Sequence, residues 1–251
     1  MTPNLEAQKN HDQLFAGHAS TLAQTDPELI EYFDNFAFDE VLRESTMQPT
    51  TRLMVQLASM IASQALGEFK VMVGAALSNG VTPVEVKEIV YQAVPYVGMA
   101  KVFDFIHATN QILTERGIEL PLPHQSTTTA DTRAAAGLAV QKLIVGAERV
   151  EAMHAGAPAD QGHIQLFLSA NCFGDHYTRT GIEVPTRELL TFAMLVSLGG
   201  CEPQVAGHVS ANLNVGNTRA MLVDILTQLL PYIGYPRTLN GLRIVNEGTS
   251  A

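Results

Sequence analysis

Residues 92–98, Gln-Ala-Val-Pro-Tyr-Val-Gly, recur with few changes as residues 228–234, Gln-Leu-Leu-Pro-Tyr-Ile-Gly. The same displacement of 136 positions aligns residues 51–110 with residues 187–246 without a gap. Other residues that agree at this offset are Leu77, Gly80 and Thr82 with Leu213, Gly216 and Thr218, and Asp39, Arg43 and Pro49 with Asp175, Arg179 and Pro185. Glycine permits positive φ and proline fixes φ, so Gly and Pro shared at one offset indicate a shared backbone. The chain is therefore predicted to contain one structural unit twice.

The two copies differ at side chains that can take part in chemistry. Three reactive residues of the second copy have counterparts of another character in the first, and the pairs are Glu188 and Arg52, Cys201 and Ala65, and His208 and Met72. A backbone kept twice with reactive side chains in one copy predicts one working site per chain, in the second half.

The composition allows a sizeable core and disfavours two classes of partner. Of the 251 residues 46% are hydrophobic, and the formal net charge is −10 without a cluster of Lys and Arg. We therefore expect neither nucleic acid nor an anionic membrane surface as a partner. The first residues do not resemble a signal peptide, and the longest apolar stretches, of about a dozen residues, are too short to span a bilayer. These features predict a cytoplasmic protein in which Cys172 and Cys201 are free thiols.

Helical periodicity dominates the chain, and no segment alternates strictly enough to predict a strand, so the predicted fold class is all-α. The predicted helical segments are 12–43, with Ser20, Thr25 and Asp26 as candidate caps, then 50–66, 68–79, 83–96, 100–116, 134–153, 162–179, 186–199, 202–215, 218–232 and 236–246. Residues 117–133, rich in proline and then in hydroxyl side chains, are predicted to be a linker. The predicted domains are a first, degenerate repeat over 1–116 and a second repeat, carrying the site, over 134–251.

Residues 189–198 are apolar nearly all round the predicted helix, and their counterpart over 53–61 is also rich in apolar residues. Such a helix is buried on every side. Two interpretations remain open: the helices cover each other across an internal interface between the repeats, or they pack against another subunit of a homo-oligomer.

Cys201 is predicted to lie at the start of a helix, after Gly199-Gly200 ends the preceding one. Free amide groups and the helix dipole at such a position favour the thiolate and lower its pKa. Gln204 and His208 share a helical face with Cys201. A rise of about 1.5 Å per residue separates Cys201 from His208 by about 10 Å along the axis. The two side chains can line one pocket but cannot bond directly.

Glu188 is brought toward His208 by the predicted hairpin. If segments 186–199 and 202–215 run antiparallel, Glu188 lies opposite residues 211–213, within reach of His208 or Asn212. A buried carboxylate beside an imidazole fixes the ring tautomer and raises its pKa, which gives a tuned acid or base. The alternative is a structural pair that satisfies buried polar groups.

Side chains that recur in both copies are predicted to be structural, because the first copy lacks the reactive set. They are the ion pairs Asp39–Arg43 and Asp175–Arg179 and the tyrosines Tyr96 and Tyr232. Tyr177, in contrast, replaces Val41 of the first copy and is a candidate for the pocket, with packing as the alternative. No histidine has a partner at a metal-ligand spacing, and phosphate loops, a nucleophile elbow and a dinucleotide fingerprint are missing, so neither a metal nor a cofactor is expected.

Residues 173–246 carry a series of motifs of one family. They are Phe173-Gly174-Asp175-x-Tyr177-x-Arg179-x-Gly181, Arg187-Glu188-Leu189, Gly199-Gly200-Cys201-Glu202-Pro203-Gln204-x-x-x-His208, Leu213-Asn214-Val215-Gly216-x-Thr218 and Pro231-Tyr232-x-Gly234-x-Pro236. This series resembles the carboxymuconolactone decarboxylase family, which shares the alkyl hydroperoxidase D fold. The resemblance is weaker over 36–110 and absent from the linker. It implies helical subunits that assemble into trimers or hexamers, and a site formed by Glu188, Cys201 and His208.

The chain departs from the peroxidase branch of that family at one position. The branch uses Cys-x-x-Cys, and Gln204 stands here in place of the second cysteine. A dithiol cycle needs two nearby sulfur atoms, and Cys172 is the other candidate for such a partner.

The leading hypothesis is a carboxymuconolactone decarboxylase-like enzyme that decarboxylates a small anionic lactone, or moves a proton on it, without a cofactor. His208 would donate the proton, Glu188 would orient it, and the helix start at Cys201 would hold the carboxylate. Gln204, Asn212 and Tyr177 are expected to line the pocket, and the chain is expected to form a homo-oligomer, with a trimer favoured. The alternatives are a thiol peroxidase that uses Cys201 and a non-catalytic oligomeric member of the family.

Overall fold

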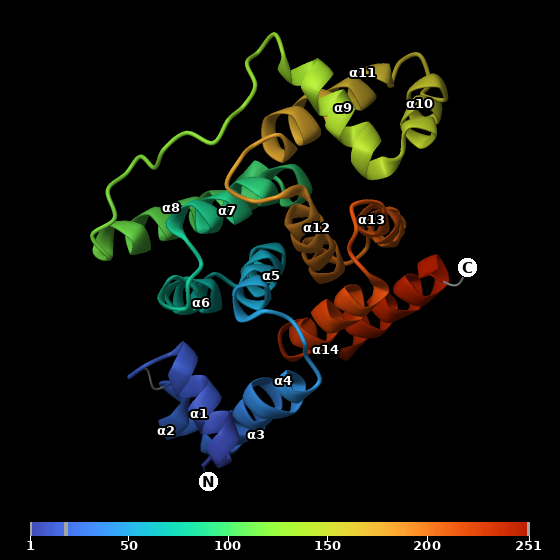
Figure 1. The fold of residues 1–251 in the computed structure, drawn as a ribbon. Helices are drawn as coiled ribbons and strands as arrows, with labels where there is room; N and C mark the ends of the chain where they lie inside the picture. Colours follow the sequence, from blue (N-terminus) through green and yellow to red (C-terminus); the bar gives the residue numbers. More distant parts are fainter. Residues whose placement is uncertain (1, 18–19, 250–251) are drawn as a thin grey trace.

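The computed structural model describes residues 2–17 and 20–249, which form helices and connecting turns without a strand, as predicted for an all-α fold (Figure 1). The elements before the linker are α1 (Leu5–Leu14), α2 (Leu22–Thr25), α3 (Pro27–Asn35), the π-helical η1 (Phe36–Glu40), α4 (Val41–Arg43), α5 (Pro49–Ala62), α6 (Leu66–Ser78), α7 (Pro83–Val97) and α8 (Met99–Glu115). Those after it are α9 (Arg133–Val145), α10 (Ala147–Ala155), α11 (Gly162–Phe167), the π-helical η2 (Leu168–Tyr177), α12 (Val184–Leu198), α13 (Glu202–Asn214) and α14 (Arg219–Thr249). None of the described helices is long and apolar enough to cross a membrane.

Two predicted helical segments differ from the structure, 12–43, which is divided after Leu14, and 134–153. Helix α1 begins at Leu5, where the side chain of Asn4 accepts a hydrogen bond from the amide of Ala7, so the chain is helical earlier than predicted. The segment predicted over 134–153 breaks at Gly146, whose φ of 98° is outside the helical region. The break predicted between segments 218–232 and 236–246 is confirmed, because Gly234, with a φ of 76°, interrupts α14 there.

Helix α7 shows how local sequence sets the boundaries of an element. Thr82 Oγ1 accepts from the amide of Glu85 at 3.2 Å, and the Glu85 carboxylate accepts from the amide of Thr82 at 2.7 Å. This reciprocal cap satisfies two amides that have no partner inside the helix. Pro83 follows at the first helical position, where its missing N–H costs nothing, and the helix ends at Gly98, with a φ of 90°.

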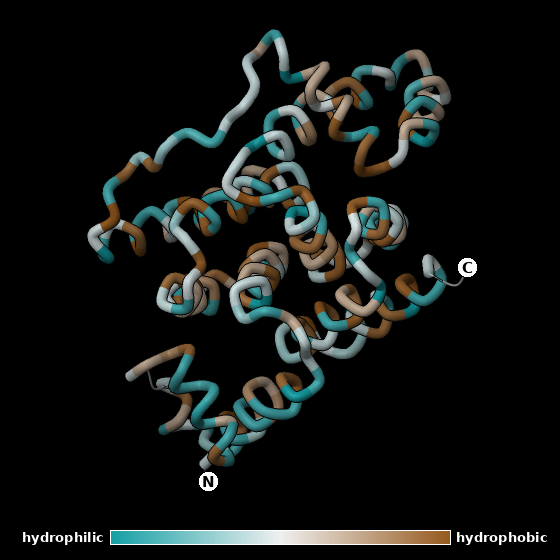
Figure 2. Tube along the Cα trace, in the orientation of Figure 1, coloured by the Kyte–Doolittle hydropathy of each residue, from teal (hydrophilic) through white to brown (hydrophobic). Residues whose placement is uncertain are grey.

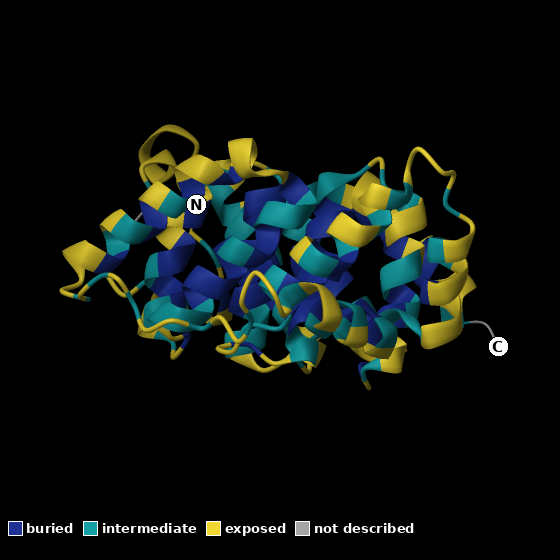
Figure 3. Ribbon diagram, turned by 90° about the horizontal axis from the view of Figure 1, so that it is seen from above, coloured by how far each residue is buried: buried dark blue, intermediate teal, exposed yellow. Residues whose placement is uncertain are grey.

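Helices α5 and α12 lie side by side at the centre of the molecule (Figure 1). Every residue from Leu53 to Ala62 and from Arg187 to Ser197 is buried, and the dark blue of Figure 3 marks this central region. The hydroxyl groups of Ser59 and Ser197 meet across the contact at 2.7 Å. These helices correspond at the repeat offset, so the internal interface between the repeats explains their apolar surfaces (Figure 2). Assembly into a homo-oligomer stays a prediction.

Each repeat places a helix against the other repeat. In α7, Gln92 Nε2 of the first repeat donates to Thr191 Oγ1 of the second at 3.1 Å. Its counterpart in α14, Gln228, donates to the carbonyl of Val41 in the first repeat at 3.1 Å. Equivalent helices of the two repeats therefore each contact the other repeat, so residues of one repeat can take part in a site of the other.

Helix α9 and η2 cross with their backbones in contact at Gly137 and Gly174. A Cβ atom at Gly137 would collide with the carbonyl of Ser169, and one at Gly174 with the carbonyl of Arg133. The contact fixes η2, which carries Cys172 and Tyr177, against the rest of the second repeat.

We expect Gly137→Ala to destabilise the fold by about 1–3 kcal/mol, because the added methyl group must push two backbones apart. In thermal unfolding this corresponds to a decrease in Tm of about 2–4 °C per kcal/mol for a chain of this size. Gly67→Ala is the control, because that glycine is helical and its new Cβ meets no atom within 4 Å. Equal Tm values for the two variants would contradict the close crossing.

Candidate active site

Glu188 and His208 form a hydrogen-bonded pair between α12 and α13. His208 Nδ1 donates to Glu188 Oε2 at 2.8 Å, where the Glu188 side chain is fully buried and the His208 side chain is 17% exposed. Gly199 and Gly200, with φ of 71° and 70°, turn the chain between the two helices. The predicted hairpin thus brings Glu188 within bonding distance of His208. Among the described residues, no protein group bonds the other ring nitrogen, Nε2.

Tyr177 donates a hydrogen bond to the second carboxylate oxygen of Glu188. Its hydroxyl donates to Glu188 Oε1 at 2.6 Å and lies 2.7 Å from Thr191 Oγ1. Burial, and then the negative charge of Glu188, raise the pKa of Tyr177 well above its ordinary value, so the phenol keeps its proton. Tyr177 therefore belongs to the Glu188–His208 site, as a donor to the carboxylate.

Tyr96, from α7 of the first repeat, also reaches this site. Its hydroxyl lies 2.9 Å from that of Tyr177, and its ring meets the His208 ring edge to face at 5.7 Å between centroids. Because the hydroxyl of Tyr177 donates its proton to Glu188, the hydroxyl of Tyr96 is the donor in its hydrogen bond with Tyr177. The Tyr96 oxygen in turn accepts a hydrogen bond from Cys172 Sγ at 3.8 Å. The duplicated motif predicts a structural role for Tyr96, whereas the structure places its ring against that of His208. This contact depends on how the two repeats pack together, which no local signal in the sequence indicates.

Asn212 links the backbones of the two residues of the pair. Its Nδ2 donates to the carbonyl of His208 at 2.7 Å and to that of Glu188 at 3.2 Å, and its Oδ1 accepts from Asn217 Nδ2 at 2.8 Å. The side chain is fully buried. Asn212 thus lies where the hairpin geometry predicted, but its polar groups are occupied by the backbone and by Asn217.

Cys201 is the N-terminal cap residue of α13, as predicted, but its predicted pKa is wrong. Burial, and then the charge of Glu202, raise the pKa of the thiol above its ordinary value. Sγ donates to the carbonyl of Leu195 at 3.2 Å. The expected free amides are also scarce, because the N–H groups of Gln204 and Val205 both bond the Cys201 carbonyl and proline at 203 has none. Burial and bonded amides thus outweigh the helix dipole.

The structure does not place Cys201 with the Glu188–His208 pair. Cys201 lines a cavity of about 20 Å³ together with residues of α12 and α14, including Arg237, and His208 is not among the residues around it. Gln204 is exposed to solvent on α13. A single pocket that holds Cys201, Gln204 and His208 stays a prediction.

Cys172 lies against the hydroxyl of Tyr96. It is 8% exposed, and burial raises the pKa of its thiol to about 12. Both cysteines are free. The two sulfur atoms thus contact different groups, Cys172 the hydroxyl of Tyr96 and Cys201 the carbonyl of Leu195.

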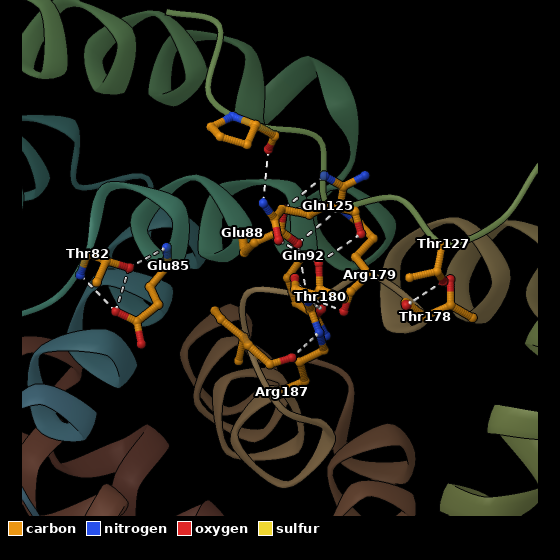
Figure 4. A network of polar contacts seen from close by, with 12 residues as sticks. Thr82, Glu85, Glu88, Gln92, Gln125, Thr127, Thr178, Arg179, Thr180 and Arg187 are labelled. Atoms are coloured by element: carbon orange, nitrogen blue, oxygen red, sulfur yellow. Dashed lines mark hydrogen bonds and ion pairs between the residues drawn. The ribbon is translucent and has the colours of Figure 1, made fainter. Parts of the chain in front are cut away.

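One of the two predicted ion pairs is wrong. Arg43 pairs with Asp39 at 2.9 Å as predicted, but Asp175 pairs with Arg133 of α9. Arg179 instead binds Glu88 of the first repeat (Figure 4). The reason is that Glu88 is buried and needs cationic partners, whereas Asp175 finds one on the neighbouring helix.

Glu88 also binds Arg187, so it holds two guanidinium groups of the second repeat (Figure 4). Arg187 Nη2 donates to Glu88 Oε2 at 2.9 Å, and Nη1 donates to Gln92 Oε1 at 2.8 Å. Arg187 is fully buried, and burial lowers the pKa of its guanidinium. This cluster fixes α7 relative to α12, and so fixes Tyr96 relative to His208. The described residues contain no group of three or more His, Cys, Asp and Glu side chains that could hold a metal ion.

The geometry and the motifs agree with comparisons to known proteins. A sequence model of the carboxymuconolactone decarboxylase family matches residues 27–111 and 163–247. The two matches are displaced by 136 positions, the offset of the internal repeat. The chain belongs to the carboxymuconolactone decarboxylase family. The matches fall on either side of the predicted linker, and the domain boundaries themselves stay a prediction.

Two relatives show how far the likeness extends. The 4-carboxymuconolactone decarboxylase of Acinetobacter baylyi is 27% identical over 111 residues, which are 44% of this chain and 82% of that protein. A crystal structure from Burkholderia xenovorans LB400, provisionally assigned as a gamma-carboxymuconolactone decarboxylase subunit, superposes with a TM-score of 0.53 at 20% identity. The superposition covers 95% of this chain and 96% of that chain, so the fold is shared throughout.

The burial of the thiols predicts slow modification of the native protein. With a pKa of about 12 for Cys172, only about one thiol in 10⁴ is ionised at pH 8, and the thiolate is the reactive form. We expect a chromogenic disulfide reagent to leave Cys172 unmodified in the folded Cys201→Ser variant and to titrate it at once after unfolding. Modification of native Cys201→Ser at the rate of a free thiol would contradict the burial of Cys172. The Cys172→Ser variant is the control that reports Cys201 alone.

Proposed function

We propose that this protein is a carboxymuconolactone decarboxylase-like lyase that acts on a small anionic lactone without a cofactor. The observation that carries the proposal is the buried Glu188–His208 pair at the junction of the repeats, with Nε2 of His208 left without a protein partner among the described residues. Membership of the family and the named activity of the A. baylyi relative support the reaction class.

The substrate class supplies its own electron sink. When the C–C bond to the carboxylate breaks, CO₂ leaves and the electron pair passes into the conjugated lactone carbonyl as a dienolate. A proton must then be delivered to carbon to complete the reaction. A general acid near neutral pH meets this need, and such groups typically contribute about 10²–10⁴-fold to the rate.

His208 is suited to that step because its two nitrogens have different roles. Glu188 accepts a hydrogen bond from Nδ1–H and so orients the ring. The proton exchanged with the substrate is therefore the one on Nε2. Tyr177 donates to the other oxygen of Glu188 and so holds the carboxylate in place. Tyr96 contacts the edge of the ring and positions it.

We assign neither the transfer step nor the holding of the substrate carboxylate to Cys201. Its thiol is bonded to a carbonyl and its pKa is raised, and the first amides of α13 are bonded within the helix. The same observations, together with the separate surroundings of Cys172, leave a thiol peroxidase with less support than a lyase. The ordered Glu188–His208 pair likewise favours an enzyme over a non-catalytic member of the family.

We expect His208→Asn to decrease the turnover of carboxymuconolactone by about 10²-fold or more, because the proposed proton donor is lost. Cys201→Ser should retain most of the turnover, and Met72→Leu, at the counterpart of His208 in the first repeat, should change it little. The measurement is the loss of lactone absorbance at matched folded concentrations, with an organic hydroperoxide plus a dithiol as the parallel substrate. A folded Cys201→Ser protein without lactone turnover, or hydroperoxide reduction that depends on Cys201, would reverse the assignment.

We also propose that the chain forms a homo-oligomer, with a trimer favoured. The support is a group of apolar side chains on α9 and α11 that are 54–66% exposed, namely Leu143, Ile164, Leu166 and Phe167. Exposed apolar side chains grouped on adjacent helices are typical of interaction surfaces. Light scattering after size exclusion should give the mass of three chains, and Phe167→Ser should shift it toward one chain. A parent protein that stays monomeric at micromolar concentration would refute the assembly.

A further inference from the structure

A cavity of about 370 Å³ lies between α7 and the linker, away from the Glu188–His208 pair. The residues around it that matter most are Lys87, Tyr91, Asn110, Leu120, Leu122 and Arg179. This volume is within the range of small-molecule sites, which combine apolar walls with a few placed polar groups. Of the residues around the cavity, Arg179 belongs to the family motifs, and the proposed reaction uses none of them.

Lys87 is a buried cation without an anionic partner. The residue is 8% exposed, yet no carboxylate lies within ion-pair distance of Nζ among the described residues. Nζ donates to Asn110 Oδ1 at 2.6 Å and lies 5.1 Å from the centroid of the Tyr91 ring. An ammonium group has three donors, so two remain for a ligand. A buried charge is stabilised only when it is paired and hydrogen-bonded.

The charges around the cavity sum to an excess of positive charge. Arg179 also faces Tyr91, with its Cζ atom 5.2 Å from the ring centroid. Glu88 lines the cavity as well, and its single carboxylate is shared by Arg179 and the fully buried Arg187. Lys87 and Arg179 thus outnumber Glu88 among the charged residues that line the cavity. A local excess of cations in a chain of net charge −10 selects for an anion at this position.

The opposite wall is apolar and tethered. Leu120, Leu122 and the two prolines between and after them line the cavity from the linker side. The linker is held at its far end because the amide of Thr180 donates to the carbonyl of Gln125 at 2.9 Å, and Thr127 Oγ1 donates to the carbonyl of Thr178 at 2.8 Å (Figure 4). A ligand that fits both walls carries an anion at one end and an apolar body at the other.

We propose that this cavity is a second binding site, which takes a small amphipathic carboxylate of the size of benzoate. The carboxylate lies between Lys87 and Arg179, and the apolar body lies against Tyr91, Leu120 and Leu122. The proposal goes beyond the proposed decarboxylation and does not depend on it.

Calorimetric titration of the whole chain with benzoate tests the proposal. We expect saturable binding of one benzoate per chain at this site, with benzamide, which lacks the charge, and acetate, which lacks the apolar body, each at least about tenfold weaker. Lys87→Met should weaken benzoate by a similar factor, because it removes the charge and keeps the aliphatic stem. Lys70→Met, at an exposed position of α6, is the matched control and should bind as the parent does.

A second variant guards against a folding defect in Lys87→Met. Asn110→Asp places a carboxylate at the 2.6 Å contact with Nζ, so the protein supplies its own anion and should stay folded while it loses benzoate. His208→Asn should retain benzoate binding at this site. Parent-like affinity in both Lys87→Met and Asn110→Asp, or equal affinity for benzamide, would overturn the proposal. Binding that is lost in His208→Asn and kept in Lys87→Met would overturn it too, by placing benzoate at the Glu188–His208 pair.

Discussion

The carboxylate of Glu88, 1% exposed, is buried between the guanidinium groups of Arg179 and Arg187, so one side chain of the first repeat forms ion pairs with two side chains of the second. Removing one partner of a buried ion pair typically costs about 3–5 kcal/mol, because the other charge is left unpaired in a medium that solvates it poorly. The two halves therefore have one favourable docking position. Glu88 and Tyr96 both lie on helix α7. The ion pairs of Glu88 therefore also fix the position of the Tyr96 ring relative to the ring of His208.

The same cluster continues into the candidate active site through neutral groups. Arg187 bonds Gln92, and Gln92 bonds Thr191. Thr191 lies against the hydroxyl of Tyr177, which donates to Glu188. Each group in this series has its hydrogen-bonding capacity used by its neighbours, so the Glu188 carboxylate is held in one orientation. A polar network of this kind, when every member is satisfied, makes a buried site rigid.

Local and periodic signals in the sequence predicted the architecture well. Glycine and proline at one offset revealed the duplication, and the Gly199-Gly200 turn was enough to place Glu188 near His208. The features that were missed depend on contacts distant in sequence. Tyr96 belongs to the first repeat but contacts His208 of the second. Arg179 forms its ion pair with Glu88 of the first repeat and not with Asp175, four residues before it. The prediction of a lowered pKa for Cys201 was wrong. It rests on the effect of a helix N-terminus on an exposed thiol, whereas this thiol is partly buried and donates to a carbonyl.

Helices α7 and α14 each contact the other repeat, and this has a consequence for which substitutions the duplicated chain can accept. In a symmetric dimer of a single-repeat chain, every substitution would occur twice, once in each of the two identical sites. Covalent linkage removes this constraint, because a residue in one half and its counterpart in the other can vary independently. Arg52 and Met72 now occupy the positions equivalent to Glu188 and His208. The first half therefore contributes Tyr96 to the site of the second half without carrying the Glu, Cys and His set itself.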